Sequence, residues 1–301
     1  MKRLIVNADD FGLTHQVNQG ILDAHRGGIV TSATLMANGG AFDHAVEIAG
    51  HAPYLGVGVH LNLTQGIPVS PARVIPTLVD GSGRMCLSAG QLWRGVVAGQ
   101  VSLSEIDTEL RAQIAKVIRA GISPTHLDGH KHLHVLPGIS HVVIRLARDF
   151  GIRSVRCPIE EAPRLSALLK SQARLRPSIL KQSLVARGVS YFARRFAAKL
   201  ERAGLFFPAH FYGICQTGFL DSPGLQDVLQ HLPEGASELM CHPGYFNTEL
   251  EKTGTRLLGQ REIELKALTA DSVRNVVISR NIQLANYVDL VRSTQWIGAA
   301  A

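Results

Sequence analysis

The sequence predicts an α/β protein in which parallel strands and helices alternate to form a (β/α) barrel. Short runs rich in β-branched residues recur between stretches of helical periodicity, about eight times along the chain. A barrel of this type needs about 250 residues, so 301 residues leave room for long loops and an insertion. We therefore expect one barrel domain over residues 1–301 rather than an open doubly wound sheet.

The barrel strands are expected where short apolar or β-branched runs are bounded by polar residues or turn formers. The segments are 3–7, 29–36, 55–61, 125–128, 153–157, 210–214, 238–241 and 282–285.

The clearest helix signal lies at residues 102–120. Ser102 and Glu105 have the spacing of a capping box, and Gly121 is placed to end the helix. Residues 62–90 hold several prolines and a glycine-rich turn, which predicts a long loop over the mouth of the barrel. The expected apolar face of the helix consists of Ile106, Leu110, Ile114, Val117 and Ile118.

Residues 160–205 are predicted to form a basic amphipathic helical insertion. Between residues 163 and 202 there are ten Lys or Arg residues and one acid, Glu201, so the segment carries a formal charge of +9. Two roles stay open for it: a surface helix packed on the barrel, or a surface for anionic lipid or another partner. The apolar residues at helical spacing are Val185, Val189, Phe192, Phe196 and Leu200.

Composition argues against several classes of protein. With 46% hydrophobic and 18% charged residues, the chain is neither disordered nor fibrous. It contains no run approaching the roughly 20 apolar residues of a membrane helix, and its beginning does not resemble a secretory signal. The four cysteines lack the spacing of a zinc site. We expect a cytoplasmic protein, with any membrane contact peripheral and on the inner face of the cytoplasmic membrane.

Acidic and imidazole side chains follow the predicted strands at the end where a barrel places its active site. One carboxylate and two imidazoles would leave open positions on a divalent metal ion for water and substrate. Two aspartates by themselves also suit a turn or a helix N-terminus. Because Gly129 predicts a turn, at most two of the three closely spaced histidines should reach a metal. The candidates are Asp9, Asp10, His60, His130, His132 and His134.

His242 stands apart from the other histidines because it ends a predicted strand and precedes Pro243 and Gly244. An imidazole at this rim could protonate a leaving group or stabilise a developing oxyanion.

Five motifs in this order resemble the YdjC-like carbohydrate deacetylases. The resemblance covers residues 3 to about 290, and the hopanoid-biosynthesis-associated deacetylases are the most similar members. That finer likeness depends on AFDHAV at 41–46, HKHLHVLP at 130–137 and the basic insertion. The five motifs are NADDFG at 7–12, GGIVTS at 27–32, GVHL at 58–61, THLDGH at 125–130 with His132 and His134, and MCHP at 240–243.

The resemblance implies a metal-dependent N-deacetylase of an acetylated amino sugar, on a deformed (β/α) barrel similar to that of the polysaccharide deacetylases. Matched position by position, it implies Asp10, His60 and His130 as ligands of one divalent ion, Zn²⁺ or Mg²⁺. Asp9 matches the general base, which takes a proton from the attacking water. His242 is then expected to protonate the departing amine.

One position departs from the family pattern. Related sugar deacetylases often have three successive histidines where this chain has His130, Lys131 and His132. Lys131 therefore cannot supply whatever the middle imidazole does in those relatives.

The likeness to the hopanoid-associated members implies an acetylglucosaminyl hopanoid as the substrate, and residues 163–202 could hold the enzyme at an anionic membrane surface. A soluble chitooligosaccharide is the alternative substrate. Two other functions remain open for the chain. One is a phosphoesterase with the same metal ligands, and the other is a basic nucleic-acid or partner-binding protein without catalysis. Aromatic residues make up only 6% of the chain and no nucleic-acid motif is present, so we expect no nucleic-acid partner.

Overall fold

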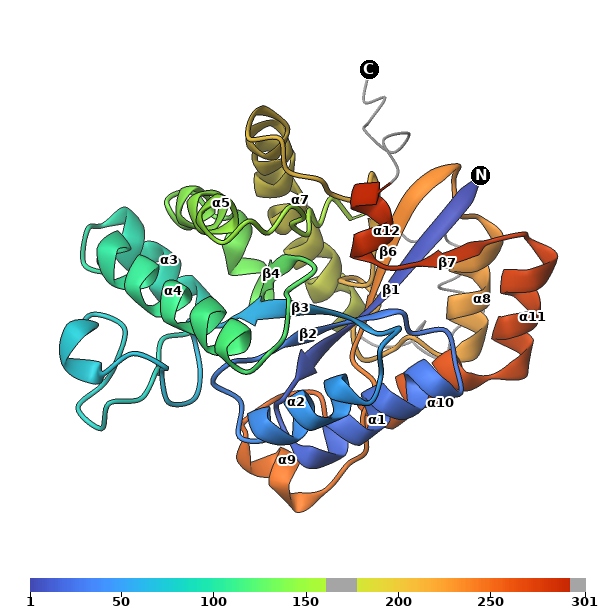
Figure 1. Cartoon of the computed structure of the whole chain (residues 1–301), viewed down its shortest axis with the longest axis horizontal. Helices are drawn as coiled ribbons and strands as arrows, with labels where there is room; N and C mark the ends of the chain where they lie inside the picture. Colours follow the sequence, from blue (N-terminus) through green and yellow to red (C-terminus); the bar gives the residue numbers. More distant parts are fainter. Residues whose placement is uncertain (161–177, 293–301) are drawn as a thin grey trace.

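The computed structural model describes residues 1–160 and 178–292, and within them seven parallel strands form one sheet (Figure 1). The strand order is β4–β3–β2–β1–β6–β5, and β7 pairs with β1 beside β2. This arrangement confirms the expected deformed (β/α) barrel. The strands are β1 (Lys2–Phe11), β2 (Ser32–Leu35), β3 (Gly56–Leu61), β4 (Leu127–Gly129), β5 (His210–Tyr212), β6 (Gly235–Cys241) and β7 (Gln283–Ala285).

One of the eight expected strands, residues 153–157, does not form a regular strand in the structure. Val155 makes an isolated parallel bridge to Leu127 of β4, and Ser154 makes another to Phe206. Leu127 and Phe206 are single pairing residues, so residues 153–157 form no continuous ladder of strand pairing. The bridge to Leu127 nevertheless extends the sheet past β4. The backbone of residue 156 is still fixed, because its N–H donates to the Leu127 carbonyl at 2.9 Å.

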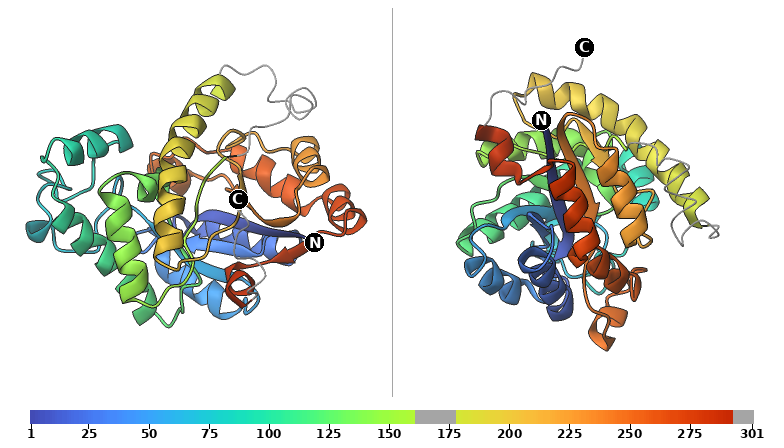
Figure 2. Two further views of the ribbon diagram at one scale, coloured as in Figure 1. Left: turned by 90° about the horizontal axis from the view of Figure 1, so that it is seen from above. Right: turned by 90° about the vertical axis from the view of Figure 1, so that its right-hand side faces the viewer.

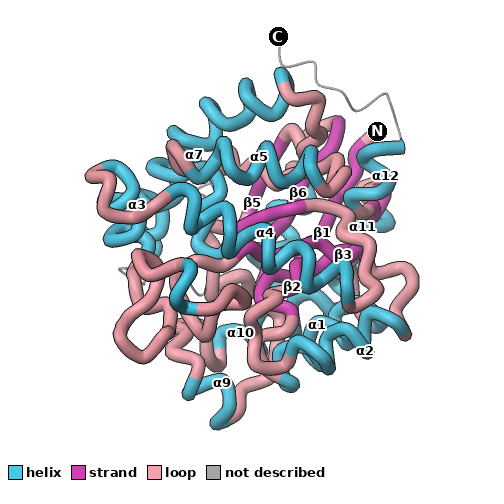
Figure 3. Tube along the Cα trace, turned by 60° about the vertical axis from the view of Figure 1, so that its left-hand side comes forward, coloured by secondary structure: helices cyan, strands magenta, loops and turns pink. Residues whose placement is uncertain are grey.

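Helices form an outer layer around the sheet (Figure 3). Helix α1 contacts α2 and α10, α4 contacts α5, and α8 contacts α10 and α11. The helices are α1 (His15–Arg26), α2 (Phe42–Gly50), α3 (Ala89–Val97), α4 (Leu103–Arg119), α5 (Ile139–Asp149), α7 (Ser178–Arg202), α8 (Ser222–Gln230), α9 (Thr248–Lys252), α10 (Gln260–Thr269), α11 (Asp271–Ser279) and α12 (Tyr287–Arg292), with 3₁₀ turns η1 (Ala72–Val74) and η2 (His130–Val135).

Helix α4 forms where the periodicity predicts it, with two corrections. The Ser102 hydroxyl caps the Glu105 N–H, but the Glu105 carboxylate accepts bonds from Thr77 instead of completing a capping box. Four of the five expected core residues are buried, whereas Ile118 is 39% exposed because it lies at the flank of the apolar face. Gly121 follows with φ +86°, a conformation that favours glycine and ends the helix.

Part of the basic insertion, residues 161–177, lies outside the described residues, and α7 follows it on the outside of the sheet (Figure 2). One face of α7 packs on the core through Phe196 and Leu200, both fully buried, and through the half-buried Phe192. Val185, expected on that face, is 50% exposed. No helix in the described ranges is long and apolar enough to cross a bilayer.

Candidate active site

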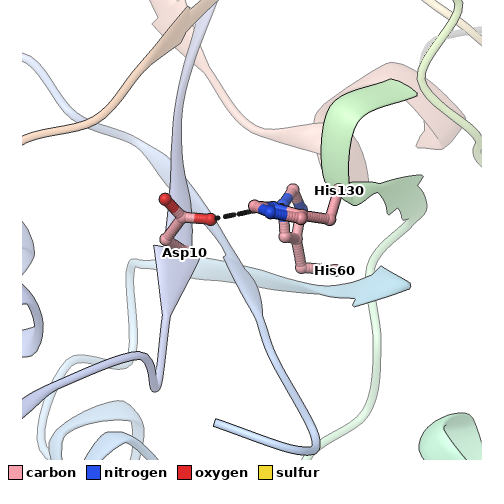
Figure 4. Close-up of side chains that lie close together, drawn as sticks. All are labelled: Asp10, His60 and His130. Carbon is pink, nitrogen blue, oxygen red and sulfur yellow. Dashed lines mark hydrogen bonds and ion pairs between the residues drawn. The ribbon is translucent and has the colours of Figure 1, made fainter. Parts of the chain in front are cut away.

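Asp10, His60 and His130 meet at the C-terminal end of the sheet, where they form an Asp–His–His triad (Figure 4). They come from the ends of β1 and β3 and from the start of η2. Asp10 Oδ1 lies 3.3 Å from His130 Nδ1 and 3.5 Å from His60 Nε2, and the two ring nitrogens are 3.3 Å apart. The three ligand atoms therefore face one another.

The backbone at Asp10 explains how two neighbouring aspartates reach the same region. Successive side chains of a regular strand point to opposite faces. Asp10 has φ +66°, and the pairing of β1 with β2 shifts register between Ala8 and Phe11. Such strain in a non-glycine residue costs about 1–3 kcal/mol and is concentrated at functional sites. The irregularity turns the Asp10 side chain toward the histidines.

Asp128 orients His60. Its Oδ1 lies 2.8 Å from His60 Nδ1, which leaves His60 Nε2 directed at Asp10 and His130. Burial opposes charge on His60, but Asp128 and the two neighbouring aspartates outweigh it and raise the pKa of His60 to about 9. A carboxylate behind a ligating histidine is the usual arrangement in metal sites, because it fixes the tautomer and strengthens the ligand.

The triad has the donor set and the unmet valence that a divalent metal ion requires. Asp10 Oδ1, the oxygen that faces both imidazoles, is a buried atom without a hydrogen-bond partner among the described residues. Asp9, His60 and Asp128 also lie close together, but there Arg156 already supplies the positive charge to both carboxylates. The triad is therefore the better fit for a metal.

Asp9 is held by Arg156, a fully buried arginine that was not predicted from the sequence as a site residue. Arg156 Nη2 donates to Asp9 Oδ1 at 2.6 Å and Nη1 donates to Oδ2 at 2.8 Å. Burial favours the protonated acid, yet Arg156 outweighs this effect and lowers the pKa of Asp9. Among the described residues, Oδ2 accepts a hydrogen bond only from Arg156, so it retains a lone pair.

Arg156 joins three carboxylates in one buried network. Besides Asp9 it pairs with Asp128 and Glu238, each at 2.8 Å, and the Tyr287 hydroxyl donates to the other oxygen of Glu238. Burial disfavours the guanidinium charge, but Asp128, Asp9 and Glu238 raise the pKa of Arg156 well above its usual value. The network fixes the carboxylates behind the triad.

Helix α10 contributes two further buried groups, Arg261 and Glu264. Arg261 Nη2 donates to Asp10 Oδ2 at 2.6 Å, on the side of the carboxylate away from the histidines. Burial raises the pKa of Asp10, but Arg261 and His130 lower it well below the usual range. Glu264 accepts the backbone N–H groups of His242 and Gly218 at 2.6 and 2.7 Å.

His242 lies near the triad but is not part of it. It is 9% exposed, and its Nδ1 has no hydrogen-bond partner within the described ranges. Burial lowers the pKa of His242 to about 4, although Asp9 and Asp10 oppose this change. Its imidazole is therefore neutral near pH 7, and it must gain a proton before it can donate one.

The histidines after His130 do not continue in an extended strand. Lys131 and His132 have φ +56° and +57°, so the chain turns at once into η2. His132 packs edge-on against Phe211, and His134 Nε2 lies 3.1 Å from the Arg156 carbonyl oxygen. Only His130 joins the triad, within the expected limit of two histidines.

Five charged residues of this site were not predicted from the sequence: Asp128, Arg156, Glu238, Arg261 and Glu264. Asp128 lies inside a quoted motif, and its position just before Gly129 and His130 was an available signal. Arg261 and Glu264 share one face of α10 but have no local motif that marks them. Their roles follow only from contacts between distant segments.

The chain is similar to proteins of known class along nearly its whole length. A carbohydrate deacetylase of Brevibacillus brevis is 36% identical over 96% of this chain and 99% of its own. A chitooligosaccharide deacetylase of Proteus mirabilis is 34% identical over 96% and 98%. A crystal structure from Enterococcus faecalis, described as a candidate cellobiose-phosphate cleavage protein, has a TM-score of 0.74 at 28% identity over 96% and 98%.

These relatives confirm the expected enzyme class, so the chain is a hydrolase of the deacetylase type. The model of the YdjC-like protein family matches residues 3–278, and the chain belongs to that family.

Proposed function

We propose that this enzyme removes the acetyl group from an N-acetylglucosamine-type sugar with the help of one divalent metal ion. The convergence of Asp10, His60 and His130, whose ligand atoms face one another, supports the proposal most directly. The relatives named carbohydrate and chitooligosaccharide deacetylases support the substrate class. Zn²⁺ and Mg²⁺ are both compatible with one carboxylate and two imidazoles.

In this proposal Asp10, His60 and His130 hold the metal, which supplies Lewis acidity toward the acetamide carbonyl and the attacking water. Asp128 holds His60 in place, and Arg261 holds Asp10, through the hydrogen bonds described above. Their contribution is the orientation of the ligands before substrate arrives.

Asp9 is the proposed general base. Its Oδ2 takes a proton from the attacking water, while Arg156 keeps the carboxylate ionised and fixed. His242 is the proposed general acid, which delivers a proton to the amine nitrogen as the C–N bond breaks. Because its pKa is low in the free protein, His242 is expected to acquire this proton during the reaction.

Deacetylation should depend on metal. Treatment with a strong chelator is expected to abolish the release of acetate from N-acetylglucosamine compounds, and Zn²⁺ or Mg²⁺ should restore it, because the triad alone provides no electrophile. Mass spectrometry of the sugars would detect the loss of acetyl groups, and elemental analysis would identify the ion. Chromogenic phosphate esters serve as the control substrate. Undiminished deacetylation after complete metal removal would contradict the proposal.

An acetylglucosaminyl hopanoid at the inner face of the membrane is the lipid-linked form of this substrate. The outer face of α7 supports it, because it exposes the basic side chains of Lys181, Arg187 and Arg195 beside apolar ones. Leu184 is 60% exposed and Tyr191 is 53% exposed. Basic residues gain about 1 kcal/mol each near anionic lipid, and exposed apolar residues add to this at the interface.

At low salt, the protein is expected to sediment with vesicles that contain phosphatidylglycerol. The variant Lys181→Glu/Arg187→Glu/Arg195→Glu should lose this binding, because it replaces attraction with repulsion on the exposed face of α7. Deleting residues 163–202 is not a suitable test, because it would also remove core residues such as Phe196.

The matched control for the vesicle experiment is Arg26→Glu/Arg119→Glu/Arg280→Glu, which changes the net charge equally at exposed positions on other elements. Equal sedimentation of both variants, or no sedimentation of the wild type, would rule out a membrane role for α7.

A soluble chitooligosaccharide is the second candidate substrate, and the name of the Proteus mirabilis relative favours it. Incubation of the enzyme with either substrate class, followed by mass spectrometry, separates the two candidates.

A further inference from the structure

A pocket of about 410 Å³ opens beside the triad, within the size range of small-molecule sites. Its walls are the segments that follow β1, β2 and β3, together with Arg84 from the 62–90 loop and one side of α9. The triad side chains do not line it. The polar side chains that matter here are Asn38, Asn62, Gln65, Arg84, Glu249 and Lys252.

The pocket is joined to the triad by short connections. The N–H of Leu13, a lining residue, donates to the Asp10 carbonyl at 3.0 Å. Asn62, another lining residue, is two positions after His60. A group bound in the pocket would therefore adjoin a group bound at the triad.

The walls are held in place without a ligand. The Asn62 side chain donates to Asn38 Oδ1 at 3.1 Å and to the Gln65 carbonyl at 2.8 Å, and it accepts from the Thr64 N–H. Thr64 in turn accepts from Lys131 Nζ at 3.1 Å, so the residue after His130 braces the same wall. The backbone of Met85 bonds to Gly66, which fixes Arg84 over the pocket.

Several polar groups on the pocket wall are available to a ligand, although the exposed Arg84 is also attracted to Asp80. The Gln65 amide, one N–H of Asn38 and the guanidinium of Arg84 make no hydrogen bond to any described residue. Lys252 is likewise unpaired there, while Glu249 provides a carboxylate whose Oε1 contacts His15. Hydrogen-bond donors and acceptors thus lie on the pocket wall beside apolar lining from Leu13, Met36 and Ile67.

We propose that this pocket binds a second sugar ring, linked to the ring whose acetamide lies at the triad. This inference rests on the proposed function and deepens it toward the oligosaccharide substrate. Sugar hydroxyls both donate and accept hydrogen bonds, so they satisfy amide, guanidinium and carboxylate groups together. A polycyclic hydrocarbon in the same place would bury those groups unpaired, at a cost in free energy.

The test compares wild-type enzyme with the variant Gln65→Ala/Arg84→Ala on N-acetylglucosamine and on chitotriose. Neither side chain makes a hydrogen bond to a described residue, and Arg84 is exposed and attracted only to the exposed Asp80, so the fold should be preserved. The variant is expected to lose about tenfold or more in kcat/KM for chitotriose and to keep wild-type activity on the monosaccharide, because only the second ring loses its partners. Calorimetric titration with chitotriose should show a matching loss of affinity.

The control variant is Gln100→Ala/Arg280→Ala, which removes the same side chains at exposed positions that do not line the pocket. Wild-type turnover and binding of chitotriose by the Gln65→Ala/Arg84→Ala variant would refute the second-ring site. If the wild type deacetylates no sugar but binds chitotriose through Gln65 and Arg84, the proposed function fails and the pocket assignment stands. An absence of both turnover and binding would refute both.

Discussion

Replacing Asp9 with asparagine is expected to lower kcat for deacetylation about a thousandfold while one divalent ion stays bound to each chain. The amide cannot take a proton from water, so the base is lost. The ion should remain because the Asp9 oxygens bond to Arg156, whereas the triad is built around Asp10 Oδ1. Acetate release under saturating substrate and elemental analysis of the same sample measure the two quantities.

The matched control for this experiment is Asp10→Asn, which places the same change one residue later. It should lose both metal and activity, because an amide replaces the only carboxylate in the triad. The assignment of the two aspartates would be reversed if Asp9→Asn released the ion and Asp10→Asn retained it. Urea unfolding of both variants shows whether either substitution, which alters the partner of Arg156 (Asp9→Asn) or of Arg261 (Asp10→Asn), has destabilised the fold.

Replacing Arg156 with methionine is expected to reduce the free energy of unfolding by about 3–5 kcal/mol. The guanidinium is fully buried, and its removal leaves Asp9, Asp128 and Glu238 close together without a counter-charge. Burying unpaired carboxylates is costly, so the folded state loses more than the bonds themselves contribute. Urea unfolding at neutral pH, where unpaired carboxylates are largely ionised in the unfolded chain, measures the loss.

Arg153→Met provides the comparison from the same segment, three residues earlier. Arg153 is exposed and lies over the Phe206 ring, so its removal should cost no more than about 1 kcal/mol. Similar unfolding free energies for the two variants would show that the Arg156 network does not stabilise the fold as proposed.

The strand pattern was predictable because buried parallel strands leave a local signature. Short β-branched runs bounded by turn formers predicted all seven strands of the described residues. Segment 153–157 carries the same signature but pairs through isolated bridges, because its neighbours offer only single residues. Propensity identifies a segment that suits a sheet, while the length of the ladder depends on partners far away in the sequence.

The triad was predictable in the same way, because strand ends gather at one rim of a parallel barrel. Asp10, His60 and His130 each follow a strand, and the motifs around them resemble those of the family. By itself, however, an alternating run of histidines suggests that several share one face. The left-handed backbone at Lys131 and His132 removes the later histidines from the triad, and no local pattern signals that turn.

The sequence by itself therefore determined the class of fold, the rim that carries the chemistry and the family. Each of these depends on residues that are neighbours in the chain or follow a strand directly. Only the tertiary structure decided that Arg156 and Arg261 hold the two aspartates and that a pocket forms among the segments that follow β1, β2 and β3. Those partners lie 147 and 251 positions apart in the chain, and burial makes their pairing strong only once the fold has excluded water.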